Sequence, residues 1–540
     1  MKKNKYRTEI IVFLALLIMG GLLSVWFGQD NNWDLLNYHL YNPWALLNGR
    51  LHVDLFTVGI QTYYNPLLDI PYYLIAVKWL PGYPKLVAFL MGLPYGVLVF
   101  FTWLIARKIA VKMNFGSSLE TESVGLLTTA FGVTGTASIA QLGTTFNEIQ
   151  QAAINLVGLY ILLLSTENLT ADKRRIWLLI AGGLFGLTAG LKLTSLSFTF
   201  GAALALLLTT RGWKARSLAM LTFGIGWLAT FGVVEAWWGY KVWHLTGNPV
   251  FPYFNNVFAS AWFPPTSTVD TRFLPKTVLE AIFYPFYWLT PKDLTVAEFP
   301  FSDFRFCLAY LGIIILGISI LYRKLKKKAA VNNEDPIPAS TDTTIIYLLV
   351  IFFVGSYVFW EASSSIIRYT VSIEALSGII FTLGLKKSGL MEKARLPMAL
   401  IIAMGVLMIT TRYLDWGRTD FSPMTFEVSA PTLPDNSMVL LVGSPVGYIA
   451  PFIKTTDGKP PKFVGIEEDD YATAKDYKIG KLTREAIQDQ QGPIFVINRP
   501  DVWEGDFLYS AFGISVNADS VQKITTNIDD PLNLFAVNPR

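Results

Sequence analysis

The chain has 540 residues, of which 52% are hydrophobic and only 16% are charged, and its mean hydropathy is +0.41. Water-soluble globular domains carry about 25% charged residues, so this composition excludes a single soluble core and indicates a protein embedded in lipid. The formal net charge is only +4, and we expect no nucleic-acid partner. Cys307 is the only cysteine, which excludes an intramolecular disulfide and argues against a cysteine-ligated metal cluster.

Apolar runs without charged residues recur along most of the chain. Most approach the roughly 20 residues that cross a bilayer, and the shorter ones can gain flanking residues. Because they are long and do not alternate, they predict helices rather than strands of a barrel. We therefore expect an all-α polytopic membrane protein with about eleven transmembrane helices, at 10–28, 86–106, 124–141, 153–165, 176–191, 193–210, 218–234, 307–321, 345–360, 373–385 and 396–411.

The first run follows a basic segment, Lys2 to Arg7, as a signal peptide would. The run is long, however, and the sequence from Trp26 to Asp30 offers no cleavage site between small residues. We expect an uncleaved membrane anchor.

Lysine and arginine collect in short loops on the cytoplasmic side of membrane proteins. Six basic clusters are separated by two spans each, as one consistent orientation requires; they lie at 2–7, 107–112, 173–175, 211–216, 323–328 and 386–395. This pattern predicts a multi-pass protein of the plasma (inner) membrane with a cytoplasmic N-terminus. The segments expected outside are the loops 29–85 and 238–305, a short loop at 361–370 and everything after residue 412.

The C-terminal part differs in kind from the rest of the chain. Its apolar runs are short, at 438–443, 462–466 and 493–498, and they alternate with a helical stretch near 482–490. We expect a transmembrane domain at 1–412, a linker at 413–435 and a small soluble extracytoplasmic α/β domain at 436–540.

Two acidic residues stand out on the expected outer face. Asp34 follows the first span, and Asn37 with Tyr38 or His39 falls near its face if this stretch is helical. Glu148 lies at the outer turn between the third and fourth spans. Each also has an ordinary structural interpretation, since Asp34 could cap a helix and Glu148 could favour a helix dipole. Converging on one face, the two acids could serve a base and an acceptor hydroxyl, or share a divalent cation.

Cationic residues occur at the same face. Lys192 interrupts an apolar stretch at an outer turn, and Arg368 and Arg305 begin spans from outside. Arginine forks suit phosphate oxygens, so a lipid phosphate is a natural ligand. A lysine here could also simply extend to the interface, and Arg305 could pair with Asp303, an interpretation that we favour slightly.

Aromatic residues and prolines are interleaved in the first outer loop and again in the second. They suggest short helices at the level of the lipid headgroups, with the aromatic residues acting as a belt or, less commonly, as platforms for sugars.

This order of features resembles the GT-C superfamily of integral membrane glycosyltransferases across about residues 1–412. In that family an essential acid follows the first span, at the position of Asp34, and a second acidic site matches Glu148. The resemblance implies a polyprenyl-phosphate-linked sugar donor whose phosphate is held by Lys192, Arg368, Tyr369 and Arg305. It also implies contacts from Asn37, Tyr38, His39 and Asp69 to the acceptor or the sugar. Adjacent acids are absent beside Asp34, so a divalent cation (Mg or Mn) on Asp34 and Glu148 is left open.

The expected function is therefore transfer of a sugar from a polyprenyl-phosphate-linked donor to a glycan, lipid or protein acceptor at the extracytoplasmic face. The resemblance implies a hexosyl- or pentosyltransferase of inverting type. Two alternatives are a transporter or flippase of lipid-linked saccharides, which should show polar residues at mid-membrane and an internal repeat, and an O-antigen ligase or polymerase. The last usually relies on arginine and histidine in one late outer loop, whereas His39, His52 and His244 are dispersed.

Overall fold

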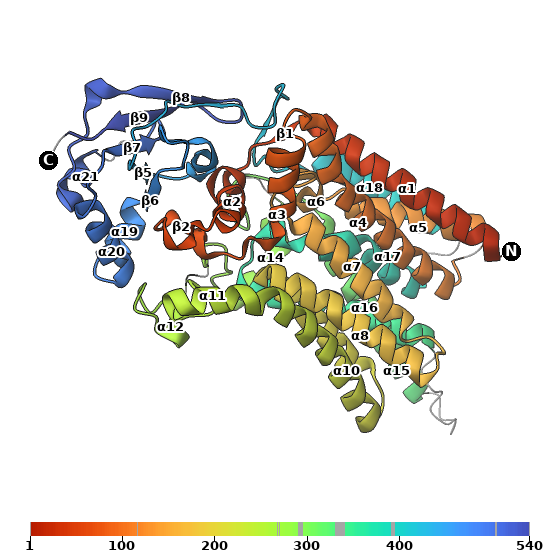
Figure 1. Cartoon of the computed structure of the whole chain (residues 1–540). Coiled ribbons are helices and arrows are strands. Elements are labelled where there is room, and N and C mark those ends of the chain that lie inside the picture. The colour runs from red at the N-terminus through yellow and green to blue at the C-terminus, as the bar shows by residue number, and fades with distance from the viewer. Residues whose placement is uncertain are drawn as a thin grey trace.

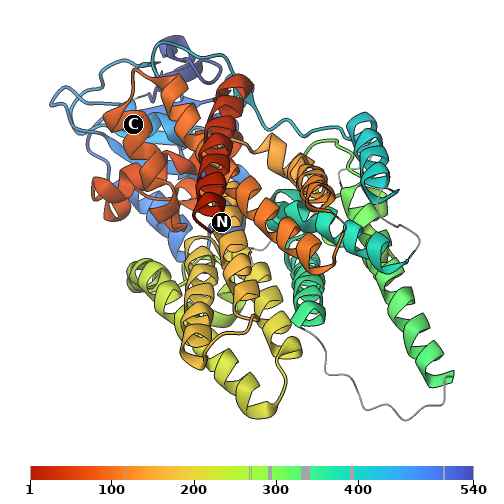
Figure 2. The same ribbon diagram turned by 90° about the vertical axis from the view of Figure 1, so that its right-hand side faces the viewer.

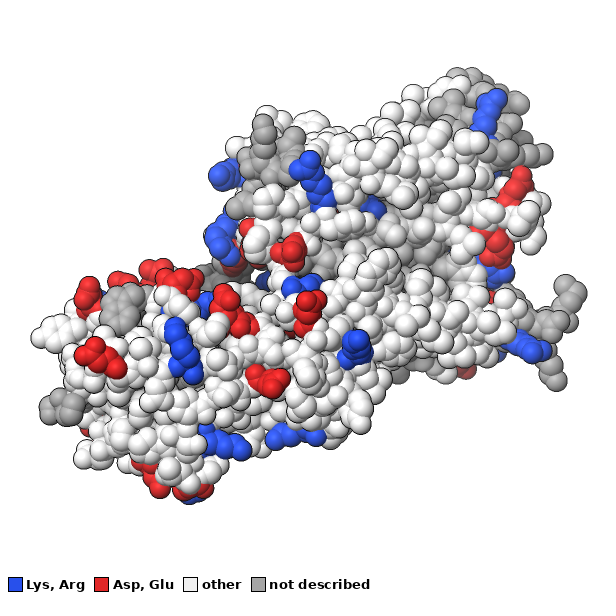
Figure 3. Space-filling view, turned by 90° about the horizontal axis from the view of Figure 1, so that it is seen from above, with Lys and Arg blue, Asp and Glu red and all other residues white. Residues whose placement is uncertain are grey.

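The computed structural model describes residues 2–115, 117–266, 268, 270–289, 295–329, 341–389, 395–502 and 505–538. A bundle of long helices forms one part of the molecule and a mixed sheet forms the other (Figure 1). The N-terminus and the sheet lie at opposite ends of the bundle. In Figure 3 charged side chains gather over the sheet end and at the far end of the bundle, with a broad uncharged surface between them.

Among the described residues, six helices are long and apolar enough to cross a membrane. These lie within α1 (Lys2–Phe27), α4 (Pro84–Lys112), α8 (Ala171–Leu191), α10 (Trp213–Phe231) with its continuation, α15 (Arg305–Ala329) and α16 (Thr341–Ser363). The continuation of α10 is a π-helical turn, η7 (Gly232–Ala236), followed by α11 (Trp237–Thr246). The chain is a mostly helical, multi-pass membrane protein.

Five further helices coincide with the other expected spans but have fewer than 18 residues. They are α5 (Ser118–Val133), α7 (Glu148–Leu164), α9 (Leu196–Thr209), α17 (Val371–Lys387) and α18 (Arg395–Thr410). At a rise of about 1.5 Å per residue each falls short of a ~30 Å hydrocarbon layer unless flanking residues contribute. The count of eleven spans stays a prediction.

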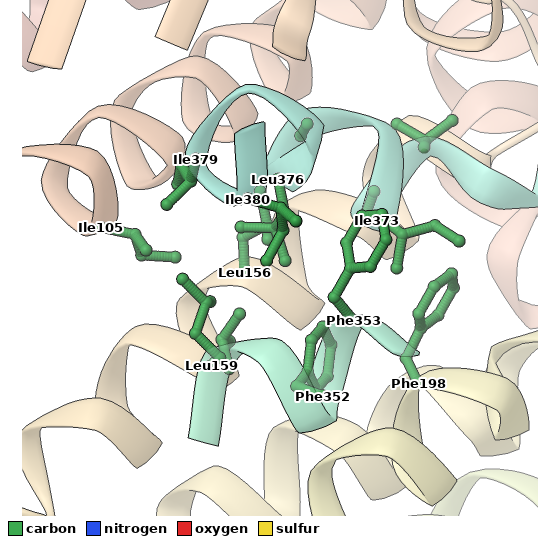
Figure 4. Close-up of a cluster of buried hydrophobic side chains, with 14 of the residues drawn as sticks. Ile105, Leu156, Leu159, Phe198, Phe352, Phe353, Ile373, Leu376, Ile379 and Ile380 are labelled. Atoms are coloured by element: carbon green, nitrogen blue, oxygen red, sulfur yellow. The ribbon is translucent and has the colours of Figure 1, made fainter. Parts of the chain in front are cut away.

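The long helices of the bundle run side by side (Figure 2), and glycines let some of them approach closely. A Cβ atom at Gly92 of α4 would lie 2.3 Å from the carbonyl oxygen of Gly20 in α1, and one at Gly182 of α8 would lie 2.0 Å from that of Phe223 in α10. Small residues are a common means of such packing in membranes. Elsewhere, large apolar side chains such as Leu156 from α7 and Phe352 from α16 fill the core (Figure 4).

The sheet has six strands in the order β4-β8-β9-β7-β5-β6. β6 (Lys462–Ile466), β5 (Met438–Val442) and β7 (Ile494–Asn498) are parallel, and β9 (Leu532–Ala536), β8 (Gln522–Thr526) and β4 (Val428–Ser429) continue the sheet antiparallel. The helices α19 (Glu468–Ala474) and α20 (Lys478–Gln488) connect β6 to β7, and α21 (Gly505–Phe512) follows. β5, β6 and β7 coincide with the three predicted strands.

The segment expected as a linker is part of this architecture. β3 (Arg418–Thr419) pairs antiparallel with β1 (Gln29–Asp30) of the first outer loop, and β4 forms one edge of the sheet. The predicted linker at 413–435 thus contains two short pairings, which the sequence does not reveal because each involves only two residues and leaves no periodic pattern.

The first outer loop folds against the sheet. It contains η1 (Leu35–His39), α2 (Tyr41–Leu47), η2 (Arg50–His52), β2 (Thr57–Ile60), η3 (Gln61–Tyr63), η4 (Pro66–Leu68), α3 (Ile70–Tyr73) and η5 (Leu74–Trp79). Its aromatic residues Tyr41, Trp44 and Tyr73 are buried in one cluster with Val439 and Phe463 of the sheet. These rings pack within the protein and do not form a lipid-facing belt, whereas Trp79 is exposed.

Candidate active site

Asp34 immediately precedes η1 and lies buried at the end of the bundle that faces the sheet (Figure 1). Its carboxylate oxygen Oδ2 accepts a hydrogen bond of 3.0 Å from the Tyr38 hydroxyl and lies 3.3 Å from Nη1 of Arg368. Nε2 of His39 is 3.8 Å from the same oxygen. Tyr38 and His39 therefore both turn toward Asp34.

A network of short polar contacts holds this turn against the turn that precedes α7. Asn32 accepts a hydrogen bond of 3.0 Å from the Leu35 amide and donates one of 3.0 Å to the Thr145 hydroxyl. Asp30 accepts 2.7 Å and 2.8 Å hydrogen bonds from the Thr145 amide and hydroxyl. Asp30 and Thr145 are 115 positions apart in the sequence, and their contact brings Asp34 and Glu148 to one place.

His39 links the same two segments. Its Nδ1 lies 2.5 Å from Oδ1 of Asp69, and that oxygen also accepts a 2.6 Å hydrogen bond from the Asn147 side chain. Asn147 has a left-handed backbone (φ 70°) and precedes α7, whose first residue is Glu148. His39 thus lies between the carboxylates of Asp34 and Asp69, and its Nε2 has no hydrogen-bond partner.

Glu148 forms a close ion pair with Lys192, whose Nζ also donates a 3.0 Å hydrogen bond to the carbonyl of Phe146. Lys192 comes directly after α8 ends, in an extended conformation ahead of η6 (Leu193–Ser195). The second carboxylate oxygen of Glu148 is buried and has no partner.

The two ion pairs meet at Tyr369, in η8 (Ile367–Thr370). Lys192 lies 5.6 Å and the Arg368 guanidinium 5.3 Å from the centre of its ring. Arg368 also packs 5.0 Å from the ring of Phe146, and its Nε is buried without a partner. Asp34, Glu148, Lys192 and Arg368 therefore belong to one cluster at the ends of four different helices, α1, α7, α8 and α17.

The charges of this cluster shape its protonation. Burial opposes the charge of Asp34, but Arg368 and His39 hold the pKa of its carboxyl well below its usual value. Burial likewise opposes the charge of His39, yet the carboxylates of Asp69 and Asp34 raise the pKa of the imidazole to about 9. At neutral pH the site holds an ionised Asp34 beside a protonated His39.

Arg305, predicted to bind the donor phosphate, lies elsewhere. Its Nη1 pairs with Asp303 at 2.7 Å and also donates to Thr411, while Nε and Nη2 donate to Phe131 and Thr134. Every nitrogen of the fork is used within the protein, so the structural alternative is correct for this residue. Asn37 is also buried, and its amide nitrogen has no partner.

The carboxylates do not form a ready metal site. Asp34 and Glu148, the expected ligands, are each engaged by a cationic side chain, Arg368 and Lys192. No group of three or more acidic, histidine or cysteine side chains suited to a metal ion occurs among the described residues. The residues present fit a pair of ion pairs better than a divalent cation, which prefers several free oxygen ligands.

An apolar groove of about 420 Å³ lies between α9 and α16, lined by Phe200, Leu204, Leu208, Val350, Ile351, Val354, Gly355 and Val358. α9 begins four residues after Lys192, and α16 ends five residues before Arg368. Both walls of the groove therefore lead toward the two cations of the site.

Several residues of the site were not predicted. Phe146 and Asn147 lie beside Glu148 in the sequence, and the outer-turn position was their only signal. Tyr64 contacts Tyr38, and Tyr253 stacks on Tyr64. Both tyrosines come from proline-rich loops that contain many other aromatic residues. Only the fold distinguishes them from their neighbours.

No protein-family model and no curated protein matches this chain. Its fold is similar to the crystal structure of ArnT from Cupriavidus metallidurans bound to undecaprenyl phosphate, with 11% identity, a TM-score of 0.41, and coverage of 98% of this chain and 99% of that one. It is also similar to the cryo-EM structure of arabinofuranosyltransferase AftD from Mycobacteria, with 13% identity, a TM-score of 0.42, and coverage of 98% of this chain and 40% of that one.

Proposed function

We propose that this protein is a membrane glycosyltransferase that moves a sugar from a polyprenyl-phosphate-linked donor to an acceptor hydroxyl at the extracytoplasmic face. The observation that carries the proposal is the convergence of Asp34, Arg368, Glu148 and Lys192 on Tyr369. Such a cluster offers an acid–base group and two phosphate-binding cations within one site. The groove between α9 and α16 supplies an apolar surface for a lipid chain.

In the proposed reaction the acceptor oxygen attacks the anomeric carbon and the bond from that carbon to the phosphate oxygen breaks. Asp34 accepts the proton of the acceptor hydroxyl, and polyprenyl phosphate leaves with the bonding electron pair. Arg368 and Lys192 stabilise the negative charge that develops on the departing phosphate.

The ion pairs suggest an order of events. A donor phosphate competes with Asp34 for Arg368 and with Glu148 for Lys192, because each cation already has an acidic partner. When Arg368 turns to the phosphate, the cation that holds the pKa of Asp34 low moves away, and Asp34 becomes a stronger base. Donor binding would thus prepare Asp34 for the acceptor.

The test separates binding from transfer in the full-length protein reconstituted in nanodiscs. Asp34→Asn removes the base but keeps the shape, so polyprenyl phosphate binding should persist while transfer from a panel of polyprenyl-phosphate sugars falls at least about 100-fold. Lys192→Met should instead weaken binding of polyprenyl phosphate about tenfold or more. Full transfer activity in the Asp34→Asn variant would show that the mechanism is wrong.

We further propose that the reaction needs no divalent cation, since both candidate ligands are held by cationic side chains. Transfer should stay within about twofold after dialysis against EDTA, because removing free metal leaves the phosphate-binding cations in place. Loss of activity on chelation, with recovery on adding Mg or Mn, would contradict this proposal.

A further inference from the structure

A row of tyrosine rings extends from Asp34 to the second outer loop. The Tyr38 hydroxyl donates to Asp34, and the Tyr38 ring meets Tyr64 edge-on at 5.6 Å between centroids. Tyr64 stacks on Tyr253 at 5.4 Å with an interplanar angle of 14°. The row therefore joins the proposed base to residues from both long outer loops.

The neighbours of these tyrosines in the sequence account for the packing between the two loops. Tyr63 and Phe251 are both buried and meet edge-on at 5.2 Å, and Trp238 of α11 donates a 3.0 Å hydrogen bond to the Tyr63 carbonyl. Tyr64 and Tyr253 remain partly exposed. Tyr64 also packs against the cluster formed by the first loop and the sheet, so the pair is part core and part exposed surface.

The backbone at both positions is fixed by polar contacts. The side chain of Asn65, next to Tyr64, donates to Glu235 at 3.0 Å, and the side chain of Asn248 donates a 2.9 Å hydrogen bond to the Tyr253 carbonyl. The two rings are consequently held in place before any ligand arrives, which reduces the entropy lost on binding.

Tyrosine combines a flat apolar face with a hydroxyl that forms hydrogen bonds. A sugar ring has the matching features, with C–H groups on one face and hydroxyls at its edge. Binding sites for small ligands characteristically combine aromatic walls with a few well-placed polar groups. Because the two rings stack on each other, a sugar ring would rest against the exposed part of the stack, near Tyr38 and Asp34, where one of its hydroxyls can react.

From this row we infer a saccharide-binding subsite in which Tyr64 and Tyr253 hold the sugar ring of the acceptor beside Asp34. The inference rests on the proposed function for the role of Asp34, but binding of a saccharide to the tyrosine pair can be measured without any transfer. The inference restricts the class of acceptor to saccharides, in which the reacting hydroxyl belongs to the sugar ring held by the tyrosines.

The test is saturation-transfer difference NMR on the full-length protein in nanodiscs, with methyl glucopyranoside, methyl mannopyranoside and methyl arabinofuranoside as probes. Wild-type protein and Tyr253→Phe, which keeps the ring, should transfer saturation to the ring protons of at least one probe. Tyr253→Leu and Tyr64→Leu should reduce that signal about fivefold or more. Tyr240→Leu, at an exposed tyrosine of α11 outside the row, is the matched control and should leave it unchanged.

Tyr253→Trp guards against misfolding of the leucine variants, because it retains an aromatic face and should keep the signal. The inference is overturned if the wild type gives no signal with any probe, or if the signal survives both leucine substitutions. A wild type that binds glycosides through the tyrosines but transfers no sugar would instead contradict the proposed function alone.

Discussion

His39 is a buried imidazole between two carboxylates, and its charge state should be visible in solution. The folded protein raises its pKa from 6.5 to about 9, so His39 should be protonated at neutral pH and lose its proton only as the pH rises through about 9. Because the folded-state pKa is the higher one, the stability that this charge contributes is complete below pH 6.5 and declines as the pH approaches 9.

The chain has only three histidines, so ¹⁵N-histidine labelling gives three resolvable sets of signals. His39→Gln assigns the one of interest. Asp69→Asn removes the carboxylate 2.5 Å from Nδ1 and should lower the pKa of His39 toward its ordinary value. A His39 signal that titrates near 6.5 in the wild type would refute the placement of His39 between two charged acids.

At the scale of elements, the bundle depends on the close approach of α8 and α10. A Cβ at Gly226 would lie 2.1 Å from the carbonyl oxygen of Leu179, whereas one at Gly224, on the same helix, would meet no atom within 4 Å. Gly226→Ala should therefore push the helices apart at a cost of about 1–3 kcal/mol, as overpacking does. Gly224→Ala should be neutral or slightly stabilising, since alanine favours a helix more than glycine.

Thermal unfolding of the two variants in identical nanodiscs checks this difference. A lower Tm for Gly226→Ala together with an unchanged or higher Tm for Gly224→Ala is expected. Equal values for the two variants would mean that α8 and α10 do not pack through these glycines.

At the scale of the whole molecule, one carboxylate ties the sheet to the first outer loop. Asp54 pairs with Arg50 at 2.5 Å and accepts hydrogen bonds of 3.0 Å from the Phe463 amide of β6 and from the Tyr41 hydroxyl. Arg50 in turn donates to the Pro461 carbonyl. Asp54→Ala leaves the buried Arg50 without its anion and should destabilise the folded protein by about 3–5 kcal/mol.

Limited proteolysis and thermal unfolding should show earlier release of residues 436–540 in this variant than in the wild type. The control is Asp457→Ala, which breaks an exposed pair with Lys459 in the same part of the chain and should have little effect. Equal proteolysis and equal Tm values for the two variants would show that Asp54 does not hold the sheet against the first loop.

The membrane character and the positions of the helices follow from the sequence alone. The reason is that the length of an apolar run and the charge of the flanking loops determine how a segment lies relative to the bilayer, whatever the distant residues are. The pairing of Arg305 with Asp303 could be weighed for the same reason, since the two residues are two positions apart. Parallel strands β5, β6 and β7 were likewise recognisable as short apolar runs.

Only the tertiary structure decided how the outer face is assembled. The contacts of Asp30 with Thr145, of His39 with Asp69 and of Tyr64 with Tyr253 join residues 115, 30 and nearly 190 positions apart, and no local pattern encodes such partners. The same reason explains why the aromatic residues of the first loop pack on the sheet and why the expected linker is paired with β1. Asp34 was recognisable as an acid beside the membrane, but its cationic partners and its tyrosine row exist only once the spans are packed.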